Sequence, residues 1–210
     1  MRVLSSTVLG AASLLLVACG TAASPGGSGP ARTSSVAAPP PSTIPAATGP
    51  VTGVGMVIDV AGSPELCLGP VMESFPPQCH GVPLGGWDWS TAGPQEEAPA
   101  GTNRPTRWGT YAVTGTFDGS TMTVSSSVPL ALYDRAAPPT PEPVTPAQLT
   151  VEEWAGVEAG VRRIPGLLTS MRQGDVGPVL ADVVHDDGTL QGWADTTFGP
   201  GAVRVTSMLS

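Results

Sequence analysis

Few side chains in this sequence are of the types that carry catalysis or bind metals. The chain has 210 residues, with three cysteines and two histidines among them. Cys67, Cys79 and His80 lie in one stretch, "CLGPVMESFPPQCH". A structural zinc site needs four ligands at characteristic short spacings, and this group offers only three, widely spaced. The sequence therefore predicts no metal site and no bound cofactor.

Acidic side chains near predicted turns are the remaining candidates for chemistry. The stretch "HDDG" holds His185, Asp186 and Asp187, and Asp88 lies between two tryptophans. Asp and Gly together favour a turn for backbone reasons alone, and a nucleophile also needs a base within reach. We therefore predict no catalytic residue and a protein that is not an enzyme. The alternative is an envelope hydrolase of unknown substrate that uses these four side chains.

Aromatic side chains form the most distinctive pattern. On a strand, Trp87 and Trp89 of "GGWDWS" point to the same face, and Trp108 and Tyr111 of a later strand could join them. If exposed, this row is a candidate ligand face that could stack on sugar rings. If buried, the same four residues form the core of a small β domain.

The N-terminus carries the clearest functional signal. A positively charged start precedes an apolar run over residues 8–18, which is shorter than the roughly 20 residues of a membrane span. It ends in Leu16-Val17-Ala18-Cys19, which resembles the bacterial lipobox. The resemblance implies a bacterial lipoprotein: a signal peptide over residues 1–18 is removed, and Cys19 carries diacylglycerol and palmitate-type acyl chains. We then expect the protein at the cell membrane, lipid-anchored on the outer, extracytoplasmic face.

Two stretches rich in small residues and proline divide the rest of the chain. Residues 20–50 contain one charge and few large apolar groups, a composition typical of a disordered tether. Residues 136–148, "AAPPTPEPVTPAQ", read as a proline-rich linker. We therefore expect a lipidated Cys19 with its tether over residues 19–50, a β domain over 51–135 and an α+β domain over 149–210.

The first folded part is predicted to be all β. Alternating or apolar segments over residues 55–60, 66–72, 82–89, 109–116 and 120–127 are candidate strands, and "FDGS" (residues 117–120) predicts a hairpin turn between the last two. Five short strands indicate a small barrel or sandwich, of which an OB-like barrel is one form.

The second folded part is predicted to be α+β. Thr150 and Glu153 form a capping box before an apolar stripe of helical spacing. Two strands, a second helix and a last strand follow, so the order αββαβ matches a ferredoxin-like unit that lacks its first strand. The stretch "IPGLLT" resembles the corresponding joint of heavy-metal-associated domains. Their CxxC motif is absent here, so the resemblance implies the topology and not the metal.

If Cys19 carries lipid, Cys67 and Cys79 are the remaining pair. An even pair of cysteines in an exported chain predicts a disulfide.

The function expected from these features is that of a binding module. The stretches "LCLGPVMESFPPQCHGVPLGGWDW", "WGTYAVTGTFDGSTMTV" and "LQGWADTTFGPGAVRVTSML" resemble a group of exported proteins and lipoproteins of high-GC Gram-positive bacteria. That resemblance supports the disulfide and the division of the chain into two folded parts, and it transfers no functional residue. The net charge of −8 argues against nucleic acid as a partner. We expect a cell-wall polymer or an envelope protein instead, and the incomplete second sheet could also accept a partner strand.

Overall fold

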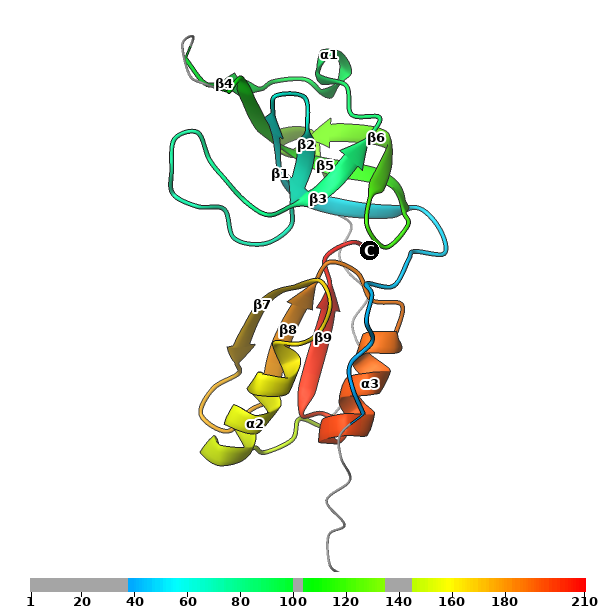
Figure 1. The fold of residues 1–210 in the computed structure, drawn as a ribbon, viewed down its shortest axis with the longest axis vertical. Coiled ribbons are helices and arrows are strands. Elements are labelled where there is room, and N and C mark those ends of the chain that lie inside the picture. The colour runs from blue at the N-terminus through cyan, green and yellow to red at the C-terminus, as the bar shows by residue number, and fades with distance from the viewer. Residues whose placement is uncertain (1–37, 100–103, 135–144) are drawn as a thin grey trace, which may run out of the picture. The chain divides into compact units, whose positions relative to one another are not determined.

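The computed structural model describes residues 38–99, 104–134 and 145–210 (Figure 1). Cys19, the expected signal peptide and most of the expected linker lie outside the described residues. Within these ranges the chain forms two β-sheets and a few short helices, which confirms a mixed α+β class with mostly strands.

The first sheet closes on itself. Its strands pair in the order β1-β2-β3-β6-β5-β4, and β1 also pairs with β5, so five of the six strands form a continuous ring. The pairing of β3 with β6 is parallel, whereas the other pairs are antiparallel. The strands are β1 (Val51–Val60), β2 (Pro64–Cys67), β3 (Val82–Gly85), β4 (Glu96–Glu97), β5 (Thr106–Phe117) and β6 (Met122–Pro129). Two short helices belong to this part, α1 (Trp89–Ala92) and the 3-10 helix η1 (Leu130–Leu132).

The turn between β5 and β6 explains why this hairpin forms. The Asp118 carboxylate accepts hydrogen bonds from the backbone N–H groups of Ser120 and Thr121, both at 2.8 Å. Gly119 has a φ of +97°, which favours glycine. The bond from Thr121, followed by those from Ser120, holds the pKa of Asp118 below its usual value. The hairpin predicted from "FDGS" is thus confirmed.

Alternation along the long strands separates two apolar faces. On β5, Tyr111 and Val113 are fully buried in the core enclosed by the ring, together with Val57 of β1. The next residue of β1, Ile58, belongs instead to a smaller cluster with Trp108 and Cys67. Because successive residues of a strand point to opposite faces, this small cluster lies on the other face of the sheet.

The second sheet has three strands in the order β7-β8-β9. The β7–β8 pair is antiparallel and the β8–β9 pair is parallel, with α3 connecting the parallel strands. The elements follow the predicted order αββαβ: α2 (Val151–Val161), β7 (Leu167–Arg172), β8 (Val179–Val183), α3 (Thr189–Phe198) and β9 (Val203–Ser207). The capping box predicted at the start of α2 is present, because Thr150 and Glu153 exchange side chain–backbone hydrogen bonds.

The end of the chain pairs with the first sheet. Thr52 N–H donates to the Ser210 carbonyl at 2.7 Å, and Ser210 N–H donates back to Thr52 at 3.2 Å. Leu209, the residue before Ser210, is fully buried in the core of the first sheet. A Cβ at Gly53 would lie 2.6 Å from a Leu209 methyl group, so the Leu209 side chain packs directly over the glycine.

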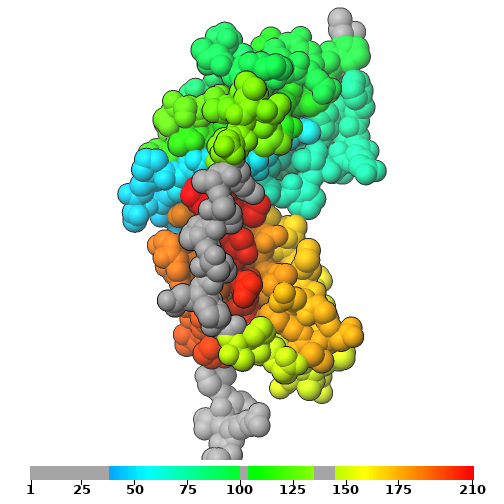
Figure 2. Space-filling view, turned by 180° about the vertical axis from the view of Figure 1, so that it is seen from behind, coloured from blue at the N-terminus to red at the C-terminus, as the bar shows by residue number. Residues whose placement is uncertain are grey.

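Residues 38–50 were expected to belong to the tether because of their composition. In the structure they contact helix α3 and strand β5. The indole N–H of Trp193 on α3 donates to the Ala38 carbonyl at 3.0 Å, and Ala47 N–H donates to Phe117 O at 2.9 Å. Ile44 packs against the core of the first sheet. Figures 1 and 2 show this blue segment beside the orange α3. The segment therefore belongs to the folded part, since specific hydrogen bonds and an apolar contact hold it there.

Candidate functional site

The loop closed by Cys67 and Cys79 covers the outer face of the first sheet. The two cysteines form the predicted disulfide, with their Cα atoms 6.0 Å apart. Cys67 belongs to the small apolar cluster on that face, together with Ile58 and Trp108. Two further residues of the disulfide loop, Val71 and Cys79, are partly buried and pack against this cluster. The disulfide thus holds a layer of loop over strands β1 and β5.

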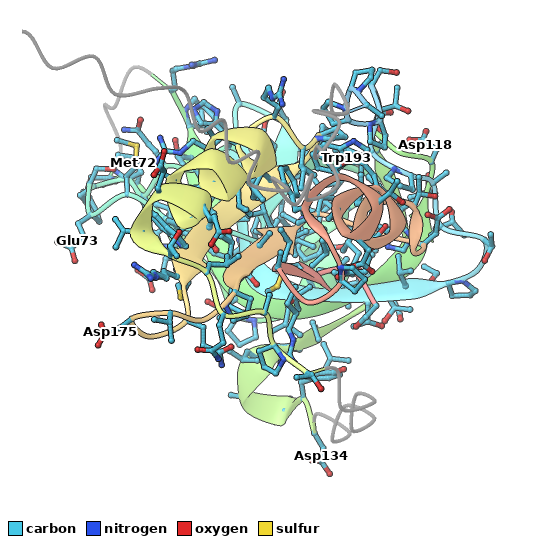
Figure 3. The ribbon with its side chains drawn as sticks, turned by 90° about the horizontal axis from the view of Figure 1, so that it is seen from below. Met72, Glu73, Asp118, Asp134, Asp175 and Trp193 are labelled. Atoms are coloured by element: carbon cyan, nitrogen blue, oxygen red, sulfur yellow. A yellow bond between two sulfur atoms is a disulfide. The ribbon has the colours of Figure 1, made fainter. Side chains whose placement is uncertain are left out.

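The tip of this disulfide loop is apolar and exposed. Phe75 is 70% exposed and Met72 is 61% exposed. The Phe75 ring meets Trp108 edge to face with ring centroids 5.6 Å apart. Figure 3 shows Met72 and Glu73 projecting outward on the same side of the molecule. Phe75 therefore contacts Trp108 of β5 with its ring while most of its surface stays exposed.

A cavity of about 540 Å³ lies between this loop and the first sheet. Its volume falls within the roughly 300–1,000 Å³ typical of small-molecule sites. Four segments contribute its walls: the end of β1, the start of β2, the second half of the disulfide loop and the start of β5. The lining residues are Ile58, Val60, Ser63, Glu65, Pro76, Pro77, Gln78, Cys79, Arg104 and Thr106.

Among the described residues that line the cavity, two carry a charge, Glu65 and Arg104, and their charges are opposite. One Glu65 carboxylate oxygen, Oε2, accepts a hydrogen bond from Gly81 N–H at 3.1 Å, which fixes the side chain. The Thr106 hydroxyl donates to the Arg104 carbonyl at 3.1 Å. The cavity therefore combines an apolar wall with one anionic and one cationic side chain.

None of the four predicted aromatic ligand residues lines this cavity. Trp87, Trp89 and Tyr111 pack edge to face, with ring centroids 5.1–6.1 Å apart. Trp108 lies in the small cluster of the opposite face instead. Tyr111 is fully buried and Trp108 is 5% exposed, so the four do not form one exposed face. Their bulk fills the two apolar clusters.

Two of the three packed aromatic residues, Trp89 and Tyr111, form hydrogen bonds within the protein. The Trp89 indole N–H donates to the Asp59 carboxylate at 2.8 Å. The Tyr111 hydroxyl donates to the Pro94 carbonyl, and burial raises the pKa of this tyrosine. The Trp87 indole nitrogen is buried and has no hydrogen-bond partner among the described residues. These contacts position α1 against the ring of strands.

Two of the acidic residues considered for hydrolysis, Asp88 and Asp186, accept hydrogen bonds from backbone N–H groups at the N-termini of helices. Asp88 is the N-cap of α1. The hydrogen bond that it accepts from the Ser90 side chain, followed by the one from the Ser90 backbone, lowers the pKa of Asp88. The Asp186 carboxylate accepts three N–H groups at the start of α3, those of Gly188, Leu190 and Gln191.

The other two members of that group lie beside Asp186 in the chain. The Asp187 carboxylate accepts a hydrogen bond from Thr189 N–H at 3.0 Å. Hydrogen bonds from Thr189, first from its side chain and then from its backbone, lower the pKa of Asp187. His185 is 8% exposed, and its Nδ1 lies 3.0 Å from the Leu209 carbonyl. Like Asp88 and Asp186, neither residue lines the cavity.

The outer edge of β9 is covered by a side chain. The Gln191 amide donates to the Val203 carbonyl at 3.1 Å and accepts from Val205 N–H at 2.9 Å. A side-chain amide thus takes the hydrogen bonds that an added strand would form there. The predicted strand addition would consequently have to use the β7 edge.

No group of three or more metal-ligating side chains comes together in the described ranges. No helix among the described residues is long and apolar enough to cross a membrane. Comparisons of the chain with family models, curated proteins and solved structures return no match.

Proposed function

We propose that this protein is a membrane-anchored extracytoplasmic lipoprotein that acts as a non-enzymatic binding module at the cell envelope. The observation that carries the binding role is the cavity beside the disulfide loop, which has the size of a ligand site. The disulfide supports the extracytoplasmic location, because structural disulfides persist in oxidising compartments.

The anchor rests on the lipobox at Cys19. Two acyl chains suffice for stable membrane attachment, whereas a single chain binds reversibly. The contacts of residues 38–50 leave the stretch from Cys19 to Ala38 as the tether. In an extended polyproline conformation, a stretch of that length would reach about 60 Å from the membrane surface. Ligands and partners within that distance are the ones the module would meet.

The ring of strands also supports a finer fold assignment, an OB-like barrel. Its order, its parallel β3–β6 closure and its helix α1 after β3 agree with that architecture. OB-folds contact ligands with the loop between their first two strands. Here that loop carries Ser63, which lines the cavity. The ferredoxin-like assignment of the second part rests on the element order αββαβ.

Blocking the cavity tests the binding role. Ser63 is exposed at its rim, so Ser63→Trp places a bulky ring there without disturbing the core. We expect fragments that shift the NMR signals of Val60, Gln78 and Thr106 in the full chain to bind at least tenfold more weakly to this variant. The probes are a library of small carboxylates, amines and amides. Every protein in the experiment carries the Cys19→Ala substitution, so that none is lipidated.

The matched control is Ser126→Trp, an equally exposed substitution on β6 outside the cavity. It should bind the fragments as the unblocked chain does. Fragments that bind Ser63→Trp with undiminished affinity, or that shift only signals remote from the cavity, would show that the cavity is not the binding site.

A further inference from the structure

We propose that the outer edge of β7 binds an extended segment of a partner protein, in which an acidic residue is flanked by apolar ones. The pairing order places β7 at one end of the second sheet, as Figure 1 shows. At the other end, the Gln191 side chain bonds to the outer backbone groups of β9, so a further strand would have to add to β7. This edge is separate from the cavity, and the inference does not depend on a ligand in the cavity.

The backbone groups of Ser170 and Arg172 point away from the sheet. Gln173 N–H donates to the Pro178 carbonyl at 3.0 Å, and the antiparallel register runs without a bulge from there through Ser170. Because hydrogen bonding alternates along an antiparallel strand, Met171 also bonds to β8, whereas Ser170 and Arg172 direct their N–H and C=O groups outward. Within the described ranges, no other segment pairs with these outward groups.

The open part of this edge is long enough to pair with a short strand. Leu168 packs against the core of the first sheet, so the open part covers residues 169–172. Strands β2 and β3 also have four residues each, and both pair within the first sheet. Each of the two outward residues offers one backbone donor and one backbone acceptor to an added strand.

The side chains of this edge alternate between the two faces of the sheet. Arg172 lies opposite Val179, which is fully buried in the core beneath helices α2 and α3. Residues directly opposite each other share a face, so Arg172 lies on the helix-covered face and Met171 on the other. The side chains of an added strand would alternate in the same way, beside one residue and then the other.

The charge of Arg172 favours an acidic residue on the added strand. Its Nη2 donates to the Leu149 carbonyl at 3.3 Å, and its Cζ lies 5.6 Å from the centroid of the Trp154 ring. Both of these partners are uncharged, and the Arg172 Nε donates to no described residue. Neither ion pair within the described ranges includes Arg172. A carboxylate opposite Arg172 would therefore supply the countercharge that this side chain lacks there.

Met171 favours an apolar residue next to that acid. Its side chain is 55% exposed on the face away from the helices. The neighbour of the acid on an added strand would lie beside Met171, where an apolar side chain would cover the exposed thioether. The edge thus suits an apolar–acidic–apolar sequence in an extended conformation.

A second copy of this chain and its own undescribed residues match the edge less well. Strand β7 has the sequence LLTSMR, so a second copy would bring another arginine and no carboxylate. In the residues outside the described ranges, the sequence has one acidic residue, Glu142, between Pro141 and Pro143. Alternate prolines favour polyproline II, whose repeat of three residues does not match the repeat of two in a strand. A segment of another protein is therefore the occupant that fits best.

Two capped peptides test the inference: acetyl-Lys-Thr-Val-Glu-Val-Thr-Lys-amide and its analogue with glutamine in place of glutamate. Each is titrated into the full chain carrying Cys19→Ala, and binding is followed from the backbone amide NMR signals of Ser170 and Arg172. We expect the glutamate peptide to bind about fivefold more tightly. Non-specific attraction predicts the opposite order, because the glutamine peptide is more positive and the chain has a net charge of −8.

Variants of Arg172 test the recognition of the acid. Arg172→Gln should abolish the preference for the glutamate peptide, because it removes the charge that the carboxylate would pair with. The matched control is Arg204→Gln, which changes an exposed arginine on β9 and should preserve the preference.

Variants of Ser170 test the pairing of the backbone. Ser170→Pro removes one outward donor and leaves the bonds to β8 in place, so it should weaken the binding of both peptides at least about tenfold. Ser170→Ala keeps the N–H group and should bind as the parent chain does. Unchanged NMR signals of Val57 and Val205 verify the fold, and if Ser170→Pro does not fold, the comparison of Arg172→Gln with Arg204→Gln decides.

Three results would overturn the inference. If neither peptide shifts the two edge signals at about 1 mM, the edge does not accept a strand. If both peptides bind equally, the acid is not recognised. If the same signals shift with protein concentration in the absence of peptide, a second copy occupies the edge. None of these results bears on the cavity, which the fragment experiment tests through different signals.

Discussion

Replacing Leu209 with alanine is expected to lower the free energy of unfolding by about 2–5 kcal/mol, the usual cost of truncating a buried leucine. Leu209 is fully buried in the core of the first sheet, although it follows the last strand of the second. On one side of its β-bridge to Gly53, Thr52 and Ser210 are joined by two backbone hydrogen bonds. Guanidinium denaturation of the two proteins measures the difference.

Leu132→Ala is the matched control, because Leu132 is 76% exposed. A surface substitution of this kind should change the free energy of unfolding by no more than about 0.5 kcal/mol. Equal, small losses in both variants would contradict the account, because Leu209 would then contribute no more than a surface leucine.

The disulfide is expected to contribute about 3 kcal/mol, the stabilisation associated with a closed loop of this approximate length. The double variant Cys67→Ala/Cys79→Ala should therefore unfold at a lower denaturant concentration than the parent chain. It should also lose fragment binding, because Pro76, Pro77, Gln78 and Cys79 of the loop form one wall of the cavity.

Reduction supplies the control for the disulfide. A dithiol reductant should destabilise the parent chain and leave the double variant unchanged. Fragment binding that survives both the substitution and the reduction would show that the loop is not needed to form the cavity.

Local features of the fold were predictable because they depend on neighbouring residues. The turn at Asp118 and Gly119 follows from backbone preferences within four residues. The capping box of Thr150 and Glu153 likewise needs only one helical turn. The Cys67–Cys79 pair followed from counting cysteines in a chain expected to be exported.

The cavity was not predictable in the same way, because its walls come from distant parts of the chain. Ile58 and Arg104 approach only because β1 and β5 pair over ten positions, and that register depends on the whole ring. Pro76 and Pro77 stiffen one wall of the cavity, but nothing local in the sequence indicates what that wall faces.

The placement of Trp87, Trp89, Trp108 and Tyr111 was underdetermined for a similar reason. The strand expected over residues 82–89 ends at Gly85, and Trp89 begins α1, so the alternation predicted for Trp87 and Trp89 does not apply. For Trp108 and Tyr111 of β5, alternation assigns each side chain to a face of the strand and does not say which face the rest of the chain covers. The disulfide loop covers Trp108, and the ring of strands encloses Tyr111. The contacts of residues 38–50 were missed because a few groups, such as Ile44 and the Ala38 carbonyl, anchor a segment of otherwise tether-like composition.

Lipid attachment at Cys19 is the claim on which the proposed function depends most, since it places the cavity at the outer face of the membrane. The most direct test is intact mass and membrane fractionation of the native protein beside a Cys19→Ala variant. We predict that the native protein carries a diacylglycerol-sized mass increment and pellets with the membrane, while the variant has neither property. Two soluble, lipid-free proteins would contradict the account, because the binding module would then be released rather than anchored.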